Sequence, residues 1–178
     1  MDVMRKAFAL FMGYLALGGV ACAATSFHPA SSDAEKAVDS VLNRVEQDTE
    51  VVLFALKLPE RDKKKDKTYQ GLFTPALAKS FAATEAAEVK KNCGGHYSAD
   101  DICGVDLNPI TCLQESTESG RLYHTISDAD GTALISYRRP DDKEVYATYR
   151  LIRQNDGWHL DGVACEGSFR FNMPESPH

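Results

Sequence analysis

Side chains that could bind a metal ion occur in two groups in this sequence, and neither group is complete. Asp128 and Asp130 supply two acids of a calcium-binding loop, but its third acid and its closing glutamate are missing. A hairpin turn explains this pattern better, because Asp and Gly favour tight turns. His96, Asp100 and Asp101 could also ligate a metal, but in a polar loop such residues are more often solvated. We therefore predict no metal site.

Catalytic signatures are also incomplete. The sequence contains no G-x-S-x-G, no H-E-x-x-H, no phosphate-binding glycine loop and no dinucleotide-binding fingerprint. His159, Asp161 and Cys165 share one face of a predicted strand by alternation, which would suit a cysteine nucleophile paired with a histidine. Six residues along a strand, however, separate His159 from Cys165 by about 20 Å. We expect a protein that is not an enzyme and needs no cofactor.

The amino-terminus has the pattern of a secretory signal peptide. Arg5 and Lys6 precede an apolar run over 7–20, and small residues follow it. The run Gly19-Val20-Ala21-Cys22 fits a permissive lipobox, which would make Cys22 a lipidated first residue and a firm membrane anchor. The alternative is ordinary cleavage within the same small residues, which discards Cys22.

The remaining cysteines favour an exported protein. They number four once the amino-terminal segment is removed, and an even number in an oxidising compartment indicates two disulfides. Of the three pairings, we expect Cys93 with Cys103, closing a short polar loop, and Cys112 with Cys165, tying the middle of the chain to its last strand. Free buried thiols are the alternative.

Length and charge limit the class of protein further. The 178 residues fit one domain and a targeting segment. A net charge of -6 argues against a nucleic-acid partner, because phosphate binding needs a basic face. We expect a signal peptide at 1–23, a tether at 24–32, one α+β domain at 33–168 and a C-terminal tail at 169–178.

Two helices are predicted before the strands. Ser32 and Glu35 fit a capping box, and apolar residues at helical spacing predict one amphipathic helix from Asp33 to Leu56. Thr74 followed by proline predicts the start of a second helix, which we expect to end near 89.

A basic run at 61–67 lies between these helices. Interleaved acidic residues favour a solvated loop over a site for phosphate or anionic lipid.

The second half of the chain predicts antiparallel strands. Alternating segments end at turn sequences such as Asp-Ala-Asp-Gly and Asn-Asp-Gly. We expect strands at 121–127, 132–139, 144–154 and 158–165, with a weaker one at 113–118. The fold class is therefore α+β, with two N-terminal helices on a curved antiparallel sheet of three to five strands. The tail from Arg170 is expected to be frayed.

A helix laid over a curved sheet can enclose a pocket. Tyr123, Tyr137, Tyr149, Trp158 and Asp161 are the residues that could line one. The alternative is that the aromatic rings simply fill the core.

Three segments resemble a known family when they are taken in order. They are Leu72-Phe-Thr-Pro-Ala-Leu77, the motif of residues 106–115, and the strand pair from Tyr149 to Asp161 with its Trp after the hairpin. Together they are similar to the YbjP-type lipoproteins, small bacterial envelope proteins of unknown function. The resemblance implies an α+β cone of the nuclear transport factor 2-like type and export to the envelope.

The motif at 106–115 is the most detailed part of this resemblance. Asp106, Pro109 and Gln114 match residues of the family motif, whereas Asn108 replaces its second Asp and Glu115 replaces its last Asp. These departures argue against an acidic site. From the residues themselves we expect a turn braced by hydrogen bonds from side chains to the backbone.

The expected function is binding of a protein partner in the periplasm. The incomplete catalytic sets, the tether, the lipid anchor and the disulfides together favour an immunity protein against an injected toxin or an accessory lipoprotein. A carrier that holds a small ligand in the cone is the alternative, and an isomerase- or hydratase-like enzyme is a third. A dimer through the open face of the sheet is compatible with all three.

Overall fold

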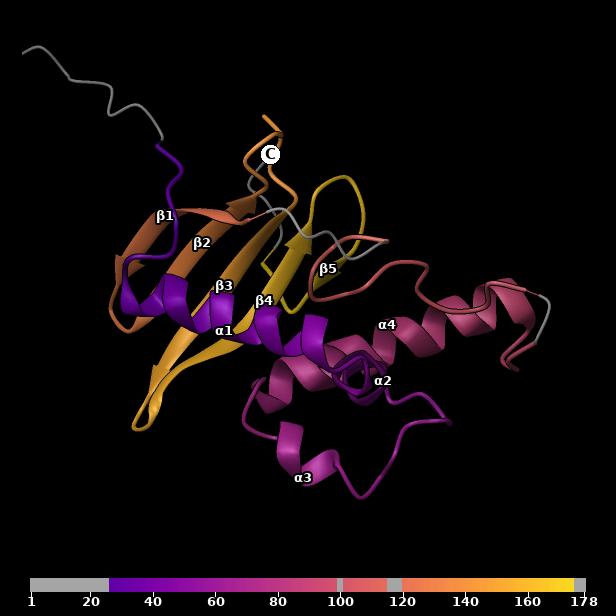
Figure 1. Cartoon of the computed structure of the whole chain (residues 1–178). Coiled ribbons are helices and arrows are strands. Elements are labelled where there is room, and N and C mark those ends of the chain that lie inside the picture. Colours follow the sequence, from indigo (N-terminus) through magenta and orange to yellow (C-terminus); the bar gives the residue numbers. More distant parts are fainter. Residues whose placement is uncertain (1–25, 99–100, 115–119, 175–178) are drawn as a thin grey trace, which may run out of the picture.

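Helices come first and strands second in the computed structural model, which describes residues 26–98, 101–114 and 120–174 (Figure 1). The elements are α1 (Asp33–Gln47), α2 (Glu50–Leu56), α3 (Asp66–Tyr69), α4 (Pro75–Cys93), β1 (Leu122–Ala129), β2 (Thr132–Arg138), β3 (Ala147–Gln154), β4 (Gly157–Cys165) and β5 (Arg170–Phe171).

The sheet is open, antiparallel and ordered β1-β2-β3-β4-β5. Its first turn has Asp130 at φ 53° and Gly131 at φ 72°, the left-handed backbone that suits a tight hairpin. Gly157, at φ 137°, closes the turn between β3 and β4. The predicted α+β class is confirmed: the N-terminal helices pack on a five-stranded antiparallel sheet, with α1 lying across it from β1 to β4.

A β-bulge in β4 changes which of its side chains share a face. Arg150 pairs with Gly162 and Leu151 pairs with Leu160, so Asp161 is the extra residue. Alternation therefore restarts at this point, and Cys165 pairs with Ala147 on the buried face. The prediction that His159, Asp161 and Cys165 share one face was wrong for this reason.

The predicted helix from Asp33 to Leu56 is two helices. Its capping box is confirmed: the Ser32 hydroxyl accepts the Glu35 N–H, and the Glu35 carboxylate accepts the Ser32 N–H. Asp48 is extended and breaks the helix after Gln47. Its carboxylate accepts hydrogen bonds from the Tyr69 hydroxyl at 2.6 Å and from the backbone of the next helix, which stabilises the break.

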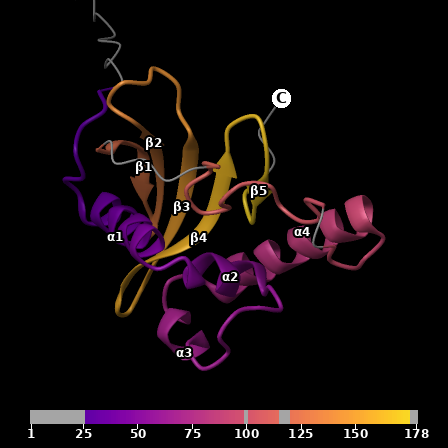
Figure 2. The same ribbon diagram turned by 45° about the vertical axis from the view of Figure 1, so that its right-hand side comes forward.

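Helix α4 begins where the sequence predicted and ends later. Thr74 accepts the Leu77 N–H, and Pro75 occupies the first turn. Lys90 and Lys91 are helix formers that continue the helix beyond residue 89, and Gly94 at φ 64° ends it after Cys93. Figure 2 shows α2 lying beside α4 and α3 beyond them, away from the sheet.

The end of the described chain is ordered by β5. Arg170 and Phe171 pair with β4, and Phe171 is fully buried with its ring 4.8 Å from that of Phe81. The backbone N–H of Asn172 donates to Ser80 at 2.9 Å. The expectation of a frayed tail from Arg170 was wrong here, because an aromatic side chain anchors it to the core.

Both disulfides form as predicted. Cys93 bonds Cys103, and Cys112 bonds Cys165. Such bonds indicate an oxidising, extracytoplasmic environment. Within the described residues, every helix is too short or too polar to cross a membrane.

Several predictions fall on other parts of the chain. The signal peptide, Cys22 and the first residues of the tether lie outside the described residues, as does most of the weak strand at 113–118. They stay predictions.

Candidate binding groove between α2 and α4

The three predicted pocket tyrosines lie in the core. Tyr123, Tyr137 and Tyr149 are at most 3 % exposed, and the ring of Tyr137 lies 6.0 and 6.4 Å from the other two. The Tyr149 hydroxyl donates to the carbonyl of Ile110 at 2.9 Å, and that of Tyr123 donates to Asp39 at 2.7 Å. All three rings thus pack within the protein core, and two of the hydroxyls have hydrogen-bond partners in the protein.

Asp161 is a structural anchor for α4. One carboxylate oxygen accepts the Thr74 hydroxyl at 2.6 Å, and the other accepts the guanidinium of Arg150 at 2.9 and 2.6 Å. Thr74 is also the N-cap of α4, so the bulge in β4 fixes where this helix starts. The side chain of Asp161 is 7 % exposed, and its two oxygens are already occupied by these groups.

Residues 106–114 of the motif form the expected braced turn, and Glu115 lies outside the described residues. The Asn108 side chain accepts the N–H groups of Ile110 and Thr111 at 2.9 and 3.1 Å. Pro109 is buried, whereas Asp106 and Gln114 are exposed. The prediction of hydrogen bonds from a side chain to the backbone is confirmed at Asn108.

Trp158 lies away from this turn, on β4. It is half-buried, with the Arg153 guanidinium 5.8 Å from its ring.

The His and Cys side chains of the last strands have structural partners. Cys165 is in a disulfide, and His159 bonds Asp156 at 2.8 Å and the Gly71 carbonyl at 3.1 Å. Among residues 26–98, 101–114 and 120–174, no three His, Cys, Asp or Glu side chains lie close enough to hold a metal ion.

A groove runs along the side of α4 that faces α2, and it consists of two hollows. The first has a volume of about 400 Å³ and the second about 270 Å³, and Lys57 lines both. We call the pair the α2–α4 groove. The first hollow is lined by Phe54, Lys57, Asp66, Gln70, Phe73, Pro75 and Ala78. The second is lined by Leu56, Lys57, Ala82, Glu85, Ala86, Val89, Gly95 and Tyr97.

Lys57 has an unusual backbone for a lysine. It ends α2 at φ 59°, in the left-handed region that favours glycine, and the Leu58 N–H then bonds the Leu53 carbonyl at 3.0 Å. Its ammonium lies 3.8 Å from the centre of the Phe54 ring. Burial lowers the pKa of Lys57, and the nearby Asp66 only partly opposes this. The charge is therefore held against an apolar wall between the two hollows.

The packing of α4 places a row of alanines, Ala78, Ala82 and Ala86, in the wall of the groove. Leu77 and Phe81 pack in the core, which leaves the alanines along the side of the helix that faces α2. Phe73 forms the floor of the first hollow, with Phe81 edge-on behind it at 5.6 Å. Small side chains on α4 thus leave room that larger ones would fill.

The far end of the groove is shaped by Glu85 and the loop after α4. Glu85 is 4 % exposed, and its carboxylate accepts the Tyr97 hydroxyl and the Val105 N–H, both at 2.8 Å. Burial and Glu85 together raise the pKa of Tyr97. The Cys93–Cys103 disulfide closes this loop and so holds Tyr97 against the groove.

Positive charge is concentrated in the segment of the sequence that supplies most of the groove residues. Residues 57–98 carry nine Lys and Arg against five Asp and Glu, whereas the rest of the chain carries 11 against 21. In the described structure only Arg61 and Lys91 of these cations pair with a carboxylate. Within the described residues, seven lysines of this segment have no ion pair, namely Lys57, Lys63, Lys64, Lys65, Lys67, Lys79 and Lys90.

No family model, curated protein or solved structure matches this chain. Its function is therefore argued from the geometry of its own residues.

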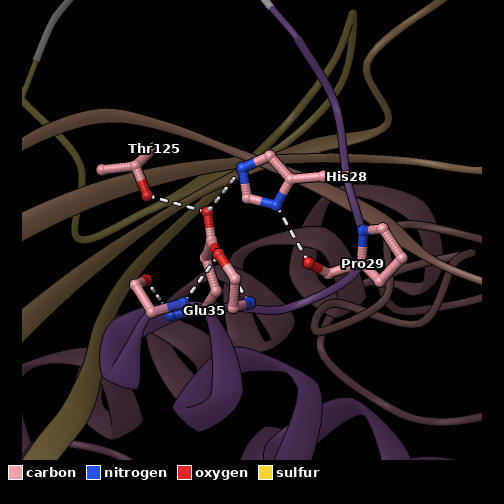
Figure 3. A network of polar contacts seen from close by, with 6 residues as sticks. His28, Pro29, Glu35 and Thr125 are labelled. Atoms are coloured by element: carbon pink, nitrogen blue, oxygen red, sulfur yellow. Dashed lines mark hydrogen bonds and ion pairs between the residues drawn. The ribbon is translucent and has the colours of Figure 1, made fainter.

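A polar network at the start of α1 has a structural role (Figure 3). Glu35 is 1 % exposed and accepts hydrogen bonds from the backbone of Ser31 and Ser32 and from the Thr125 hydroxyl at 2.9 Å. Burial raises the pKa of Glu35, but these hydrogen bonds outweigh it and hold the pKa at about 2. His28 lies 3.8 Å from the same carboxylate, and its backbone pairs with Tyr123 of β1.

The groove was not predicted from the sequence, which indicated a pocket lined by residues of the sheet. The available signals were an alanine-rich α4, a lysine at a helix end and unbalanced positive charge over 57–98. Only the packing of α2 against α4 brings these features together.

Proposed function

We propose that this protein is a non-enzymatic, exported envelope protein that binds a protein partner through the α2–α4 groove. The observation that carries the proposal is the groove itself, in which the Lys57 ammonium lies over the Phe54 ring where the two hollows meet. Apolar centres with a charged rim are typical of protein interfaces.

The packing of the sheet favours this function over the two alternatives. A carrier needs free space beneath the helices, but the three core tyrosines pack against one another and against α1 there. An isomerase-like enzyme would need Asp161 or Tyr149 free to move a proton. Asp161 is bound to Arg150 and Thr74, and Tyr149 is bound to Ile110.

The periplasm is the compartment that we propose for this activity. The two disulfides require oxidising conditions, and the predicted signal peptide at 1–23 would deliver the chain there. Lipidation of Cys22 would anchor it to the membrane, and the tether would let the groove reach a partner.

The finer fold is part of the same proposal. Helices on one face of an antiparallel sheet resemble the nuclear transport factor 2-like cone, and the resemblance to YbjP-type lipoproteins would place the chain among small envelope proteins. An immunity protein and an accessory lipoprotein both fit this description, because each works by holding another protein.

Affinity purification tests the proposal. The tagged full-length protein would be cross-linked in its native cells, purified from the envelope and read by mass spectrometry. We expect one protein partner in stoichiometric amount. If no partner is recovered and native mass spectrometry shows a small molecule bound to the protein, the proposed function is wrong and the protein is a carrier.

A further inference from the structure

The shape of the α2–α4 groove limits what can occupy it. Its walls run along α4 from Ala78 to Val89, which is about 16 Å of helix. Lys57 projects between the two hollows and belongs to both. A small ligand would fill one hollow only, whereas a peptide segment could occupy both and pass over the lysine.

The charge around the groove limits the occupant further. Lys57 lines both hollows, Lys65 and Lys67 flank the wall residue Asp66 in the sequence, and none of the three has an ion pair within the described residues. Asp66 itself is neutralised by Arg61 at 3.4 Å. Carboxylates are the groups that such a rim would attract, and a basic segment would be repelled.

The apolar floor of the first hollow indicates which side chain the occupant should place there. Phe54 and Phe73 stack with their centroids 6.5 Å apart beneath the first hollow. An apolar side chain placed there loses contact with water and fills the space, which is how anchor residues stabilise interfaces.

We propose that the occupant is an acidic segment of the partner protein, which inserts an apolar side chain into the first hollow and places carboxylates against Lys57, Lys65 and Lys67. This inference rests on the proposed function and names the chemistry of the partner. Lys57 is then the residue that selects the sign of charge, and the two aromatic rings hold the anchor.

Site-specific photo-crosslinking in native cells tests this inference. A benzoyl-phenylalanine would replace Gln70, an exposed residue at the rim of the first hollow, and in a separate strain Ala87, an exposed residue of α4 that does not line the groove. The captured peptide would be sequenced. We expect capture from position 70 of a peptide in which Asp and Glu outnumber Lys and Arg.

Charge variants at Lys57 make the test specific. In the strain with the probe at position 70, Lys57→Glu should lower capture at least fivefold, because it places a carboxylate against carboxylates. Lys57→Arg keeps the positive charge and should stay within twofold of the parent. Equal capture by both variants would overturn the role of charge.

Other outcomes separate this inference from the proposed function. A basic or neutral peptide, or a peptide from a second copy of this chain, would overturn the acidic partner segment. Capture from position 87 alone would overturn the groove but leave protein binding in place. Absence of capture at position 70 overturns the inference in every case, and the affinity purification then decides whether the proposed function falls as well.

Discussion

Lys57 combines an unfavourable backbone conformation with a charged group in the groove. Its left-handed conformation is unfavourable for any residue with a Cβ atom, and glycine is the usual residue at such a helix end. A lysine here supplies what glycine cannot, an ammonium held over Phe54 at the centre of the groove. Strain of this kind is often found where a protein binds something.

Substitutions at Lys57 should separate stability from binding. Lys57→Gly and Lys57→Ala both remove the ammonium, so both should weaken partner capture equally. Only glycine relieves the left-handed backbone, so Lys57→Gly should be more stable than Lys57→Ala by about 1 kcal/mol. Urea unfolding of the two variants measures this difference. Equal stability would mean that the backbone at 57 is not left-handed.

Glu35 should make the protein sensitive to acid. Its pKa falls from 4.5 to about 2 on folding, so its stabilising contribution is fully present above pH 4.5 and is lost as the pH falls towards 2. The lowered pKa contributes about 3 kcal/mol to the free energy of unfolding, because each unit of pKa shift corresponds to about 1.4 kcal/mol.

Glu35→Gln tests this contribution. The variant should be less stable than the parent at pH 7, and the difference should shrink between pH 4.5 and pH 2. Urea unfolding followed by circular dichroism at several pH values gives the comparison. A constant difference across that range would contradict the account.

At the scale of elements, α4 is the helix on which the groove depends. Asp161 fixes its first turn through Thr74, while Glu85 and the Cys93–Cys103 disulfide hold the loop that follows it. One side of the helix fills the core and the other forms the wall of the groove. Changes at either end should therefore alter binding without touching the groove itself.

Gly104 tests the loop end of this helix. A Cβ atom at position 104 would overlap the Glu85 carboxyl group, which is held by Tyr97 and Val105. Gly104→Ala should displace that carboxylate, lower stability by about 2 kcal/mol and weaken partner capture. Gly71→Ala is the matched control, because a Cβ atom there meets nothing within 4 Å. Thermal unfolding of both variants measures the change in stability. An equal loss of stability in the two would refute the role of Glu85.

The two disulfides should differ in their effect on stability. Cys112–Cys165 spans 53 residues and Cys93–Cys103 spans 10. A disulfide stabilises the protein by restricting the unfolded chain, and a longer loop is restricted more. Replacing the first pair by alanine should therefore lower the free energy of unfolding by about 4 kcal/mol, and replacing the second by about 3 kcal/mol. Urea unfolding of the two double variants measures both costs, and the reverse order would contradict this explanation.

Features that depend on neighbours in the sequence were predictable. The capping box at Ser32, the N-cap at Thr74 and the hairpin at Asp130 each involve residues within four positions of one another. The bulge at Asp161 was not predictable, because its carboxylate is bound by Thr74, which lies 87 residues away. The groove likewise requires α2 and α4 to meet, and spacing along the chain does not encode that contact.

At the scale of the whole molecule, charge is divided between two regions. The helices at 57–98 carry excess positive charge, and the remainder of the chain is acidic. Such a division orients an approaching charged partner and makes the association rate depend on ionic strength. Partner binding should therefore slow as salt is raised, which stopped-flow mixing at two salt concentrations would measure. A rate independent of salt would contradict an acidic partner segment.

The central claim is that a protein partner binds in the α2–α4 groove, and two neighbouring alanines test it most directly. Ala86 lines the groove, whereas Ala87 is also exposed on α4 but does not line it. Partner recovery would be measured by affinity purification of Ala86→Arg and Ala87→Arg. We predict at least a tenfold loss for Ala86→Arg, because the arginine fills the groove with bulk and charge, and recovery close to that of the parent for Ala87→Arg. Equal recovery by the two variants would contradict the account.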